Sequence, residues 1–300
     1  TFLGPEQRAR AWQRLGSEQF DVIVIGGGIV GAGAALDAAT RGLKVALVEA
    51  RDFASGTSSR SSKMFHGGLR YLEQLEFGLV REALHERELS LTTLAPHLVK
   101  PLPFLFPLTN RWWERPYIAA GIFLYDQLGG AKSVPAQKHL TRSGALRLSP
   151  GLKRSSLVGG IRYYDTVVDD ARHTMTVART AAHYGAVVRT STQVVALLRE
   201  GDRVTGVRVR DSEDGEITEV RGHVVVNATG VWTDDIHTMA GGRGRFHVRA
   251  SKGVHIVVPR DRIVSEVAII LRTEKSVLFV IPWGTHWIIG TTDTDWNLDL

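Results

Sequence analysis

The chain of 300 residues contains no cysteine. Disulfide bonds, thiolate zinc sites and cysteine nucleophiles are therefore excluded. No stretch approaches the roughly 18 consecutive apolar residues that a membrane-spanning helix requires. The first residues mix polar and charged side chains and lack the apolar core of a signal peptide, so a cytosolic protein is expected.

A clustered basic surface is also missing, although the formal net charge is +6. The arginines are scattered, as in "RVTGVRVR" and "RGRFHVR", without the basic stripe and interleaved aromatics typical of nucleic-acid binding. No nucleic-acid partner is expected, whereas anionic substrates and anionic lipid headgroups remain open. The histidines show no H-x-x-x-H or carboxylate spacing, so no metal site is predicted.

The N-terminal third carries the pattern of a dinucleotide-binding unit. The apolar run "DVIVI" at 21–25 predicts a buried parallel strand, and "GGGIVGAGAALDAATRG" follows it directly. Gly26, Gly28 and Gly31 have the G-x-G-x-x-G spacing, which permits a sharp turn, close approach to a pyrophosphate and tight packing of the next helix. A second predicted strand, "KVALVEA", reaches Glu49, where an acid binds ribose hydroxyls and argues against a 2′-phosphorylated nucleotide.

A long polar loop, "RDFASGTSSRSSKMFHGGLRYL", follows the second strand. A nicotinamide-dependent dehydrogenase would place a third strand and a crossover there, but this loop has no apolar period. The loop can instead follow a large polar cofactor. Its hydroxyls, which suit phosphate and ring atoms, are those of Thr57, Ser58, Ser59, Ser61 and Ser62. Gly67 and Gly68 would let the main chain lie against a flat ring, so flavin fits better than nicotinamide.

The sequence resembles the FAD-dependent glycerol-3-phosphate dehydrogenases, within the glycine-oxidase-like flavoproteins. The matching words follow the family's order: "DVIVIGGGIVGAGAALDAATRGLKVALVEA", "TSSRSSKMFHGGLRYLE", "EALHERE", "LAPHLVKPLPFLFPL", "DDAR", "VVNATGVW", "KGVHIVVP" and "FVIPWGTHWIIGTTDTDW". The resemblance implies oxidation of glycerol 3-phosphate to dihydroxyacetone phosphate, with hydride transfer to FAD and electrons passed to a respiratory quinone. It also implies a cytoplasmic enzyme that is peripheral on the inner face of the cytoplasmic membrane.

The fold class implied by the resemblance is α/β. We expect a Rossmann-like FAD-binding domain and a discontinuous mixed β-sheet substrate (cap) domain, truncated at the C-terminus because the family's chains continue further. Residues 1–16 are predicted to be a polar leader, residues 17–92 plus 158–243 the FAD-binding domain, and residues 93–157 plus 244–300 the cap.

Two local predictions accompany this division. The proline-rich segment "APHLVKPLPFLFPLT" is expected to be a domain crossing, because prolines at this density interrupt a helix. A helix is predicted within 73–94, with an apolar face at Leu72, Leu75, Leu79 and Ala83.

Candidate site residues follow from the matching words. Arg70, Tyr71 and His255 are the predicted catalytic residues: a guanidinium suits bidentate phosphate binding, the tyrosine adjoins it, and the histidine is a candidate base or orienting donor. The predicted cofactor-binding residues are Gly26, Gly27, Gly28, Ile29, Val30, Gly31, Glu49, Ala50, Thr57, Ser58, Ser61, Lys63, Met64, His66, Gly67, Gly68, Val194, Ala228, Thr229 and Gly230. Thr292 and Asp293 are further candidates for the pocket. The resemblance implies noncovalent flavin, although attachment to His66 is chemically feasible.

Other interpretations remain open. Oxygen as the acceptor would make the protein a glycerol-3-phosphate oxidase, the fragment alone could be a noncatalytic flavin-binding module, and an amino-acid oxidase belongs to the same superfamily. The aromatic patch 111–130 with its basic flanks is compatible with an anionic membrane surface, with an internal cap helix or with a homodimer contact.

Overall fold

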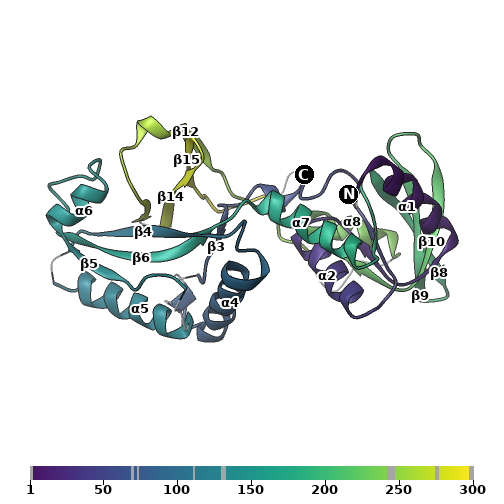
Figure 1. The fold of residues 1–300 in the computed structure, drawn as a ribbon, viewed down its shortest axis with the longest axis horizontal. Coiled ribbons are helices and arrows are strands. Elements are labelled where there is room, and N and C mark those ends of the chain that lie inside the picture. The colour runs from purple at the N-terminus through teal and green to yellow at the C-terminus, as the bar shows by residue number, and fades with distance from the viewer. Residues whose placement is uncertain are drawn as a thin grey trace. The chain divides into compact units, whose positions relative to one another are not determined.

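The computed structural model describes residues 3–68, 71–72, 74–110, 112–129, 133–241, 247–273 and 277–296. These residues form two compact units, each built from separate parts of the chain (Figure 1). The first unit takes its described residues from 3–61 and 170–250, and the second takes them from 62–169 and 251–296.

The first unit is built on one sheet. Its elements are α1 (Pro5–Ser17), β1 (Gln19–Ile25), α2 (Ile29–Thr40), β2 (Val45–Val48), η1 (Thr57–Ser59), α7 (Asp170–His183), β7 (Val187–Arg189), β8 (Thr192–Glu200), β9 (Arg203–Asp211), β10 (Ile217–Asn227), η3 (Gly230–Trp232) and α8 (Thr233–Met239). The strand order is β7-β2-β1-β10-β9-β8. Strands β7, β2, β1 and β10 are parallel, whereas β10, β9 and β8 are joined by antiparallel pairing.

Both faces of this sheet carry apolar side chains, and both faces are covered by helices. In β1, Ile23 packs in one core cluster with Leu15 of α1, while Val24 packs in another with alanines of α2 and α7. Successive side chains of a strand point to opposite faces, so the continuous apolar run needs a cover on each side. Figure 1 shows α2 and α7 side by side, and these helices supply Ala35 and Ala178 to the second cluster.

The second unit is built on a mixed sheet. Its elements are β3 (Met64–Phe65), α4 (Phe77–Leu89), the π-helical turn η2 (Ser90–Leu94), β4 (Lys100–Leu108), α5 (Glu114–Gly129), β5 (Lys138–Thr141), α6 (Arg142–Leu148), β6 (Gly159–Val167), β11 (Ser251–Lys252), β12 (Ile256–Pro259), η4 (Arg260–Arg262), β13 (Ala268–Arg272), β14 (Val277–Trp283), β15 (His286–Gly290) and β16 (Thr294–Asp295). The order is β12-β15-β14-β13-β4-β6-β3, with β5 also paired to β6, and β11 pairs separately with β16. Neighbours are antiparallel except β13 and β4.

Helices α5 and α6 cover opposite faces of this sheet. Phe104 and Ile270 share a buried cluster with Ile122 of α5. Leu105, the neighbour of Phe104 on β4, points the other way and packs against Ala145 of α6. None of the described helices combines the length and the apolar character needed to cross a membrane.

The chain exchanges between the units at places that differ from those predicted. It enters the second unit after Ser61 and returns at Asp170, whereas the predicted boundaries are 92/93 and 157/158. The segment after Ser61 lies in the second unit because β3 pairs with β6, with Met64 opposite Val167. Within the described residues, the last exchange is at 250/251, a few residues beyond the predicted 243/244.

The proline-rich segment is not a domain crossing. Residues 100–108 of this segment form β4 within the second unit, and β4 pairs with β6 along its whole length. Pro101, Pro103 and Pro107 are spaced by even numbers of residues, so their missing N–H donors fall along one edge of the strand. The opposite edge keeps every donor, and this is why a strand with three prolines can sit inside a sheet.

Helix α4 buries a different face from the one predicted. Its buried residues are Val80, Leu84 and Arg87. Of the predicted face, Leu72 is buried with Val80 and Leu84 but precedes the helix, as does Leu75. Leu75 and Leu79 are 71% and 47% exposed. Arg87 belongs to the buried face because it pairs with the buried carboxylate of Asp165, as described below. A helical face predicted from the spacing of apolar residues cannot include such an arginine. The predicted polar leader, which could be helical or loose, is a helix, α1, whose buried Ala11 and Leu15 pack on the sheet of the first unit.

Candidate functional site

A crevice of about 590 Å³ opens in the first unit at the carboxyl ends of the parallel strands. The residues that directly follow β1, β2 and β10, which are Gly26, Glu49 and Ala228, all line it. The N-terminus of α2 contributes Gly28 and Ile29. This edge of an α/β sheet is where ligands bind, and the N–H groups of a first helical turn attract anions. The crevice therefore has the position and the polarity of a nucleotide-phosphate site.

Two glycines of the motif are required by close backbone contacts. Gly26 has a φ of +107°, and a Cβ there would lie 2.6 Å from the carbonyl oxygen of Ala228. A Cβ on Gly31 would lie 1.9 Å from the carbonyl oxygen of Gly26. A side chain at either position would force the loop after β1 away from its neighbours and reshape the crevice.

Polar groups link the parts of the crevice. Glu49 Oε2 accepts a hydrogen bond from the Gly27 N–H at 2.6 Å, and its Oε1 accepts one from the Arg51 N–H at 2.8 Å. Ser58 Oγ accepts from the Ile29 N–H at 2.9 Å, at the start of α2. The Ser58 hydroxyl thus satisfies an N–H group of the kind that binds phosphate oxygens.

A second cavity, of about 740 Å³, lies within the second unit. Its polar lining comprises Ser62, His66, Asp165, Ser251, Arg272, Thr291, Thr292 and Asp293. Its apolar and aromatic lining includes Tyr71, Leu72, Leu75, Phe77, Phe106, Tyr117, Ile118, Leu124, Tyr163, Ile270, Val277 and Phe279. An apolar cavity with a few convergent polar groups is typical of a small-molecule site.

A buried ion pair anchors the loop beside this cavity. Arg87 Nη1 donates to Asp165 Oδ1 at 2.8 Å, and the two side chains are only 3% and 4% exposed. The Tyr125 hydroxyl donates to Asp165 at 3.0 Å and accepts from the Gly67 N–H at 2.6 Å. Burial raises the pKa of Asp165, and the Arg87 guanidinium counteracts only part of that effect. The glycine pair of the polar loop is therefore attached to a buried carboxyl group through one tyrosine.

His255 contacts the cavity through Ser62. Its ring Nε2 lies 3.0 Å from Ser62 Oγ, and Ser62 lines the cavity. Burial, together with the nearby Lys63 ammonium, lowers the pKa of His255 below its ordinary value of 6.5. The imidazole is consequently neutral at pH 7, which is the state that a general base requires.

Comparison with known proteins decides the family. The model of a family described as FAD dependent oxidoreductase matches residues 21–299. The chain belongs to this FAD-dependent oxidoreductase family. Over 298 residues it is 88% identical to a glycerol-3-phosphate dehydrogenase from Mycobacterium leprae, covering 99% of this chain and 51% of that protein. It is 42% identical over 305 residues to the mitochondrial glycerol-3-phosphate dehydrogenase of Homo sapiens, covering 97% of this chain and 42% of that protein.

The chain also resembles solved structures. The glycerol-3-phosphate dehydrogenase from Bacillus halodurans complexed with FAD superposes with a TM-score of 0.79 at 31% identity, over 100% of this chain and 52% of that one. The chain thus spans about half the length of the bacterial relatives it matches. These findings confirm the resemblance, FAD as the cofactor and the α/β fold class with a Rossmann-like FAD-binding domain and a mixed-sheet domain.

The crevice fits the ADP half of FAD. The glycine loop leaves room for a pyrophosphate at the N-terminus of α2, and Glu49 ends the neighbouring strand, where an acid contacts ribose. The predicted cofactor-binding residues that line the crevice are Gly26, Gly28, Ile29, Val30, Glu49, Ala50, Thr57, Ser58, Val194, Ala228, Thr229 and Gly230. Gly27 and Gly31 lie behind this lining, the first bonded to Glu49 and the second packed on Gly26.

The remaining predicted residues are distributed over other positions. His66, Gly68, Tyr71, Thr292 and Asp293 line the cavity of the second unit. Lys63, Met64 and Gly67 belong to the same unit but are not part of that lining, and Ser61 belongs to the first unit, where its hydroxyl donates to Asp170. Arg70 lies outside the described residues. The roles assigned to these individual residues stay predictions.

Several lining residues escaped the sequence-based prediction. The crevice adds Thr192, Gln193, Trp232, Asp235 and Met239, and the cavity adds Phe106, Asp165 and Arg272. Asp165 could have been identified from the sequence, because an acid within the mostly apolar strand sequence "GGIRYYDTVV" needs a hydrogen-bonding or charged partner once it is buried. No such signal marks the crevice residues, because they reach the nucleotide edge only through the path of η3 and α8 and the start of β8.

Proposed function

We propose that the protein containing this chain oxidises glycerol 3-phosphate to dihydroxyacetone phosphate, with FAD bound through the crevice of the first unit. The observation that carries the proposal is the 88% identity, over 99% of this chain, to a protein named glycerol-3-phosphate dehydrogenase. That similarity extends across both the crevice and the cavity. Bound FAD would supply the acceptor for a hydride from the secondary carbon of the substrate.

Residues of the second unit support the other requirements of this reaction. The substrate hydroxyl must lose a proton, and neutral His255, hydrogen-bonded to Ser62 at the cavity wall, is the candidate base. The substrate phosphate needs a cation, and the Arg272 guanidinium in the cavity lining has the planar geometry that binds phosphate. Asp165 also lines the cavity, but its pairing with Arg87 limits its repulsion of a dianion.

Anaerobic addition of glycerol 3-phosphate to the purified FAD-loaded protein tests the proposal. We expect the yellow flavin absorbance to bleach. Glycerol, which lacks the phosphate, and glycine or proline, which are amino-acid oxidase substrates, should leave the absorbance unchanged. Bleaching by an amino acid but not by glycerol 3-phosphate would overturn the proposal. Yellow protein that no substrate bleaches would identify a noncatalytic flavin-binding module.

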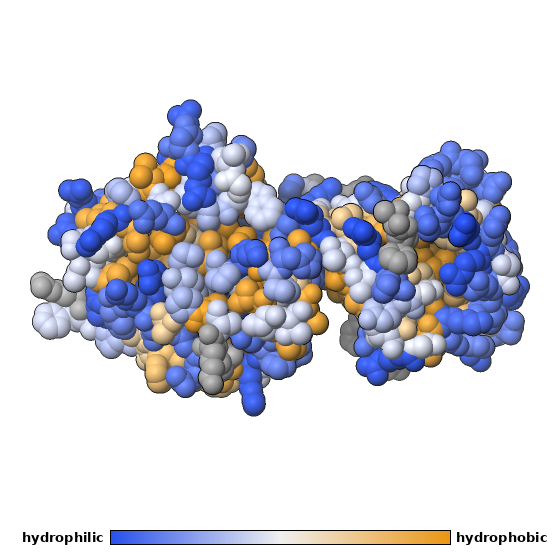
Figure 2. Space-filling view, viewed as in Figure 1, coloured by the Kyte–Doolittle hydropathy of each residue, from blue (hydrophilic) through white to orange (hydrophobic). Residues whose placement is uncertain are grey.

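We further propose a quinone, and not oxygen, as the electron acceptor. Support comes from the apolar side of the second-unit cavity, where Phe77, Phe106 and Leu124 offer a surface for an apolar ring. Figure 2 shows apolar residues gathered over β4 and β6 on one face of this unit. The substrate-reduced protein is expected to reduce a quinone analogue much faster than it reduces oxygen. Rapid peroxide formation without quinone reduction would instead identify a glycerol-3-phosphate oxidase.

A position on the inner face of the cytoplasmic membrane completes the proposal. Trp112, Trp113, Tyr117 and Phe123, in and just before α5, are 85%, 54%, 49% and 59% exposed. Aromatic side chains of this kind favour the headgroup region of a bilayer. The protein should sediment with vesicles containing phosphatidylglycerol, and Trp112→Ser with Trp113→Ser should weaken this binding. Unchanged vesicle binding, with loss of a homodimer in light scattering, would assign these tryptophans to a contact between two copies.

A further inference from the structure

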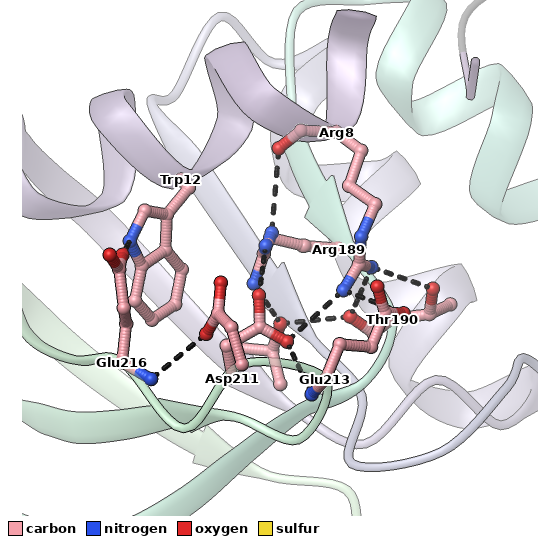
Figure 3. Close-up of polar contacts among 9 residues, drawn as sticks. Arg8, Trp12, Arg189, Thr190, Asp211, Glu213 and Glu216 are labelled. Atoms are coloured by element: carbon pink, nitrogen blue, oxygen red, sulfur yellow. Dashed lines mark hydrogen bonds and ion pairs between the residues drawn. The ribbon is translucent and has the colours of Figure 1, made fainter. Parts of the chain in front are cut away.

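Helix α1 is attached to the first unit by a buried charge cluster. Figure 3 shows the guanidinium groups of Arg8 and Arg189 both turned toward Asp211. Arg189 Nη2 donates to Asp211 Oδ2 at 2.5 Å, and Arg8 Nη2 donates to Asp211 Oδ1 at 3.2 Å. The Arg189 and Asp211 side chains are only 5% and 3% exposed, whereas that of Arg8 is 24% exposed. One carboxylate therefore joins the N-terminal helix to β7.

Two further contacts fix the geometry of this cluster. The indole ring of Trp12, one turn along α1, lies under the Arg189 guanidinium at 4.4 Å, and its Nε1 donates to Glu216 at 3.0 Å. Arg8 Nη1 also donates to the carbonyl oxygen of Thr190 at 2.8 Å. Helix α1 therefore contacts both the end of β7 and the turn that follows it.

The start of β8, directly after that turn, forms one wall of the FAD crevice. Arg189 Nη1 donates to Thr192 Oγ1 at 3.0 Å, and Thr192 lines the crevice with Val194. The main chain of Glu49 is bonded to the same turn twice: its N–H donates to the Arg189 carbonyl at 2.9 Å, and its carbonyl accepts from the Thr192 N–H at 2.8 Å. The position of Glu49, the acid expected at the ribose, is therefore fixed by hydrogen bonds to Arg189 and Thr192, at the two ends of the turn that Arg8 and Arg189 contact.

We propose that α1 is a buttress for the adenosine end of the FAD crevice, with Arg8, Asp211 and Arg189 as positioning residues. Arg8 and Arg189 fix the turn 189–192, and the turn fixes Glu49 and Thr192 where the ribose and adenine bind. The inference rests on the FAD chemistry of the family and is independent of the substrate proposed above. Its partner is the nucleotide half of the cofactor, so ADP alone should sense it.

The test compares two arginines of α1. Arg8→Ala removes the contacts with Thr190, Asp211 and Glu213 but leaves the buried Arg189–Asp211 pair in place, so the protein should still fold. Arg10→Ala is the matched control, because Arg10 pairs with Glu6 of the same helix, its side chain is 72% exposed, and no hydrogen bond or ion pair joins it to the turn among the described residues. Binding of FAD is measured by flavin fluorescence, and binding of ADP by competition with FAD.

We expect Arg8→Ala to weaken both FAD and ADP by about tenfold, the order of one lost hydrogen bond to a charged group. Arg10→Ala should stay within about twofold of the unchanged protein. Arg8→Lys, which keeps the charge, should recover part of the affinity. Measurement well below the unfolding temperature separates positioning from simple loss of stability. Unchanged ADP affinity in Arg8→Ala, or an equal loss in Arg10→Ala, would overturn the proposal.

Discussion

Replacing Gly31 with alanine should damage the FAD crevice, whereas the same replacement at Gly33, in the same helix, should be harmless. A Cβ on Gly31 would lie 1.9 Å from the Gly26 carbonyl oxygen and 3.3 Å from the Ala228 Cβ. Real Cβ atoms essentially never approach within 3.0 Å, so α2 and the glycine loop must separate by about 1 Å. A Cβ on Gly33 would have no neighbour within 4 Å.

The magnitudes follow from these contacts. Alanine is about 1 kcal/mol more favourable than glycine inside a helix, so Gly33→Ala should raise the free energy of unfolding by about that amount. Gly31→Ala gains the same propensity, but a clash against main chain places it at the severe end of overpacking, about 3 kcal/mol or more. The net loss is then about 2 kcal/mol. FAD affinity should fall about tenfold, because hydrogen bonds from the first turn of α2 weaken steeply when displaced.

Two measurements check this prediction. Urea unfolding followed by tryptophan fluorescence yields the free energy of unfolding, and titration with flavin yields the FAD affinity. The two variants differ by one methyl group at positions two residues apart, so each serves as the control for the other. If Gly31→Ala matched Gly33→Ala in both stability and affinity, the close packing of α2 on the glycine loop would not be what shapes the crevice.

Three further predictions concern ionisable and polar groups. Tyr125→Phe should cost about 1–3 kcal/mol in urea unfolding, because it leaves the buried Gly67 N–H without its acceptor, and a cost below 0.5 kcal/mol would contradict this. Lys63→Met removes a nearby positive charge and should raise the pKa of His255 toward 6.5, which moves the acid limb of the pH profile of kcat/KM to higher pH. A pH profile with an unchanged acid limb would show that His255 is not the general base. Burial opposes ionisation of Asp211, but the Glu213 N–H and Arg189 outweigh it and lower the pKa of Asp211 below 3.8. The ionised carboxylate therefore adds to the free energy of unfolding above pH 3.8, and this contribution should be lost as the pH falls through the lowered pKa. In Asp211→Asn, this acid-dependent loss of stability should be absent.

Motifs that act over short distances in the chain were predictable. The glycine spacing, the strand before it and Glu49 at the end of the next strand indicated the nucleotide unit, and the structure places all of them at one crevice. The polar loop was associated with the cofactor because of its composition. Its division between the units was not predictable, since that depends on β3 pairing with β6 about a hundred residues later.

The face of α4 illustrates why the rest of the site was missed. The hydrophobic periodicity of the sequence predicted that Leu75 and Leu79 are buried. The structure instead exposes both and buries Arg87, because Arg87 forms an ion pair with the buried Asp165. A buried charge is favourable only when its partner is present, and the sequence does not say which residues will meet. The same reasoning applies to Tyr125, whose hydroxyl reaches Gly67 across 58 residues.

The amino-acid sequence by itself determined the nucleotide motif, the fold class and the family, because these depend on residue types at fixed short spacings. Tertiary structure alone decided which segments make each unit, which side chains line the cavity and how α1 is held. Arg8 and Asp211 are 203 residues apart, yet their contact shapes the turn beside the crevice. Such contacts arise when distant segments pack together, and no local pattern of residues records them.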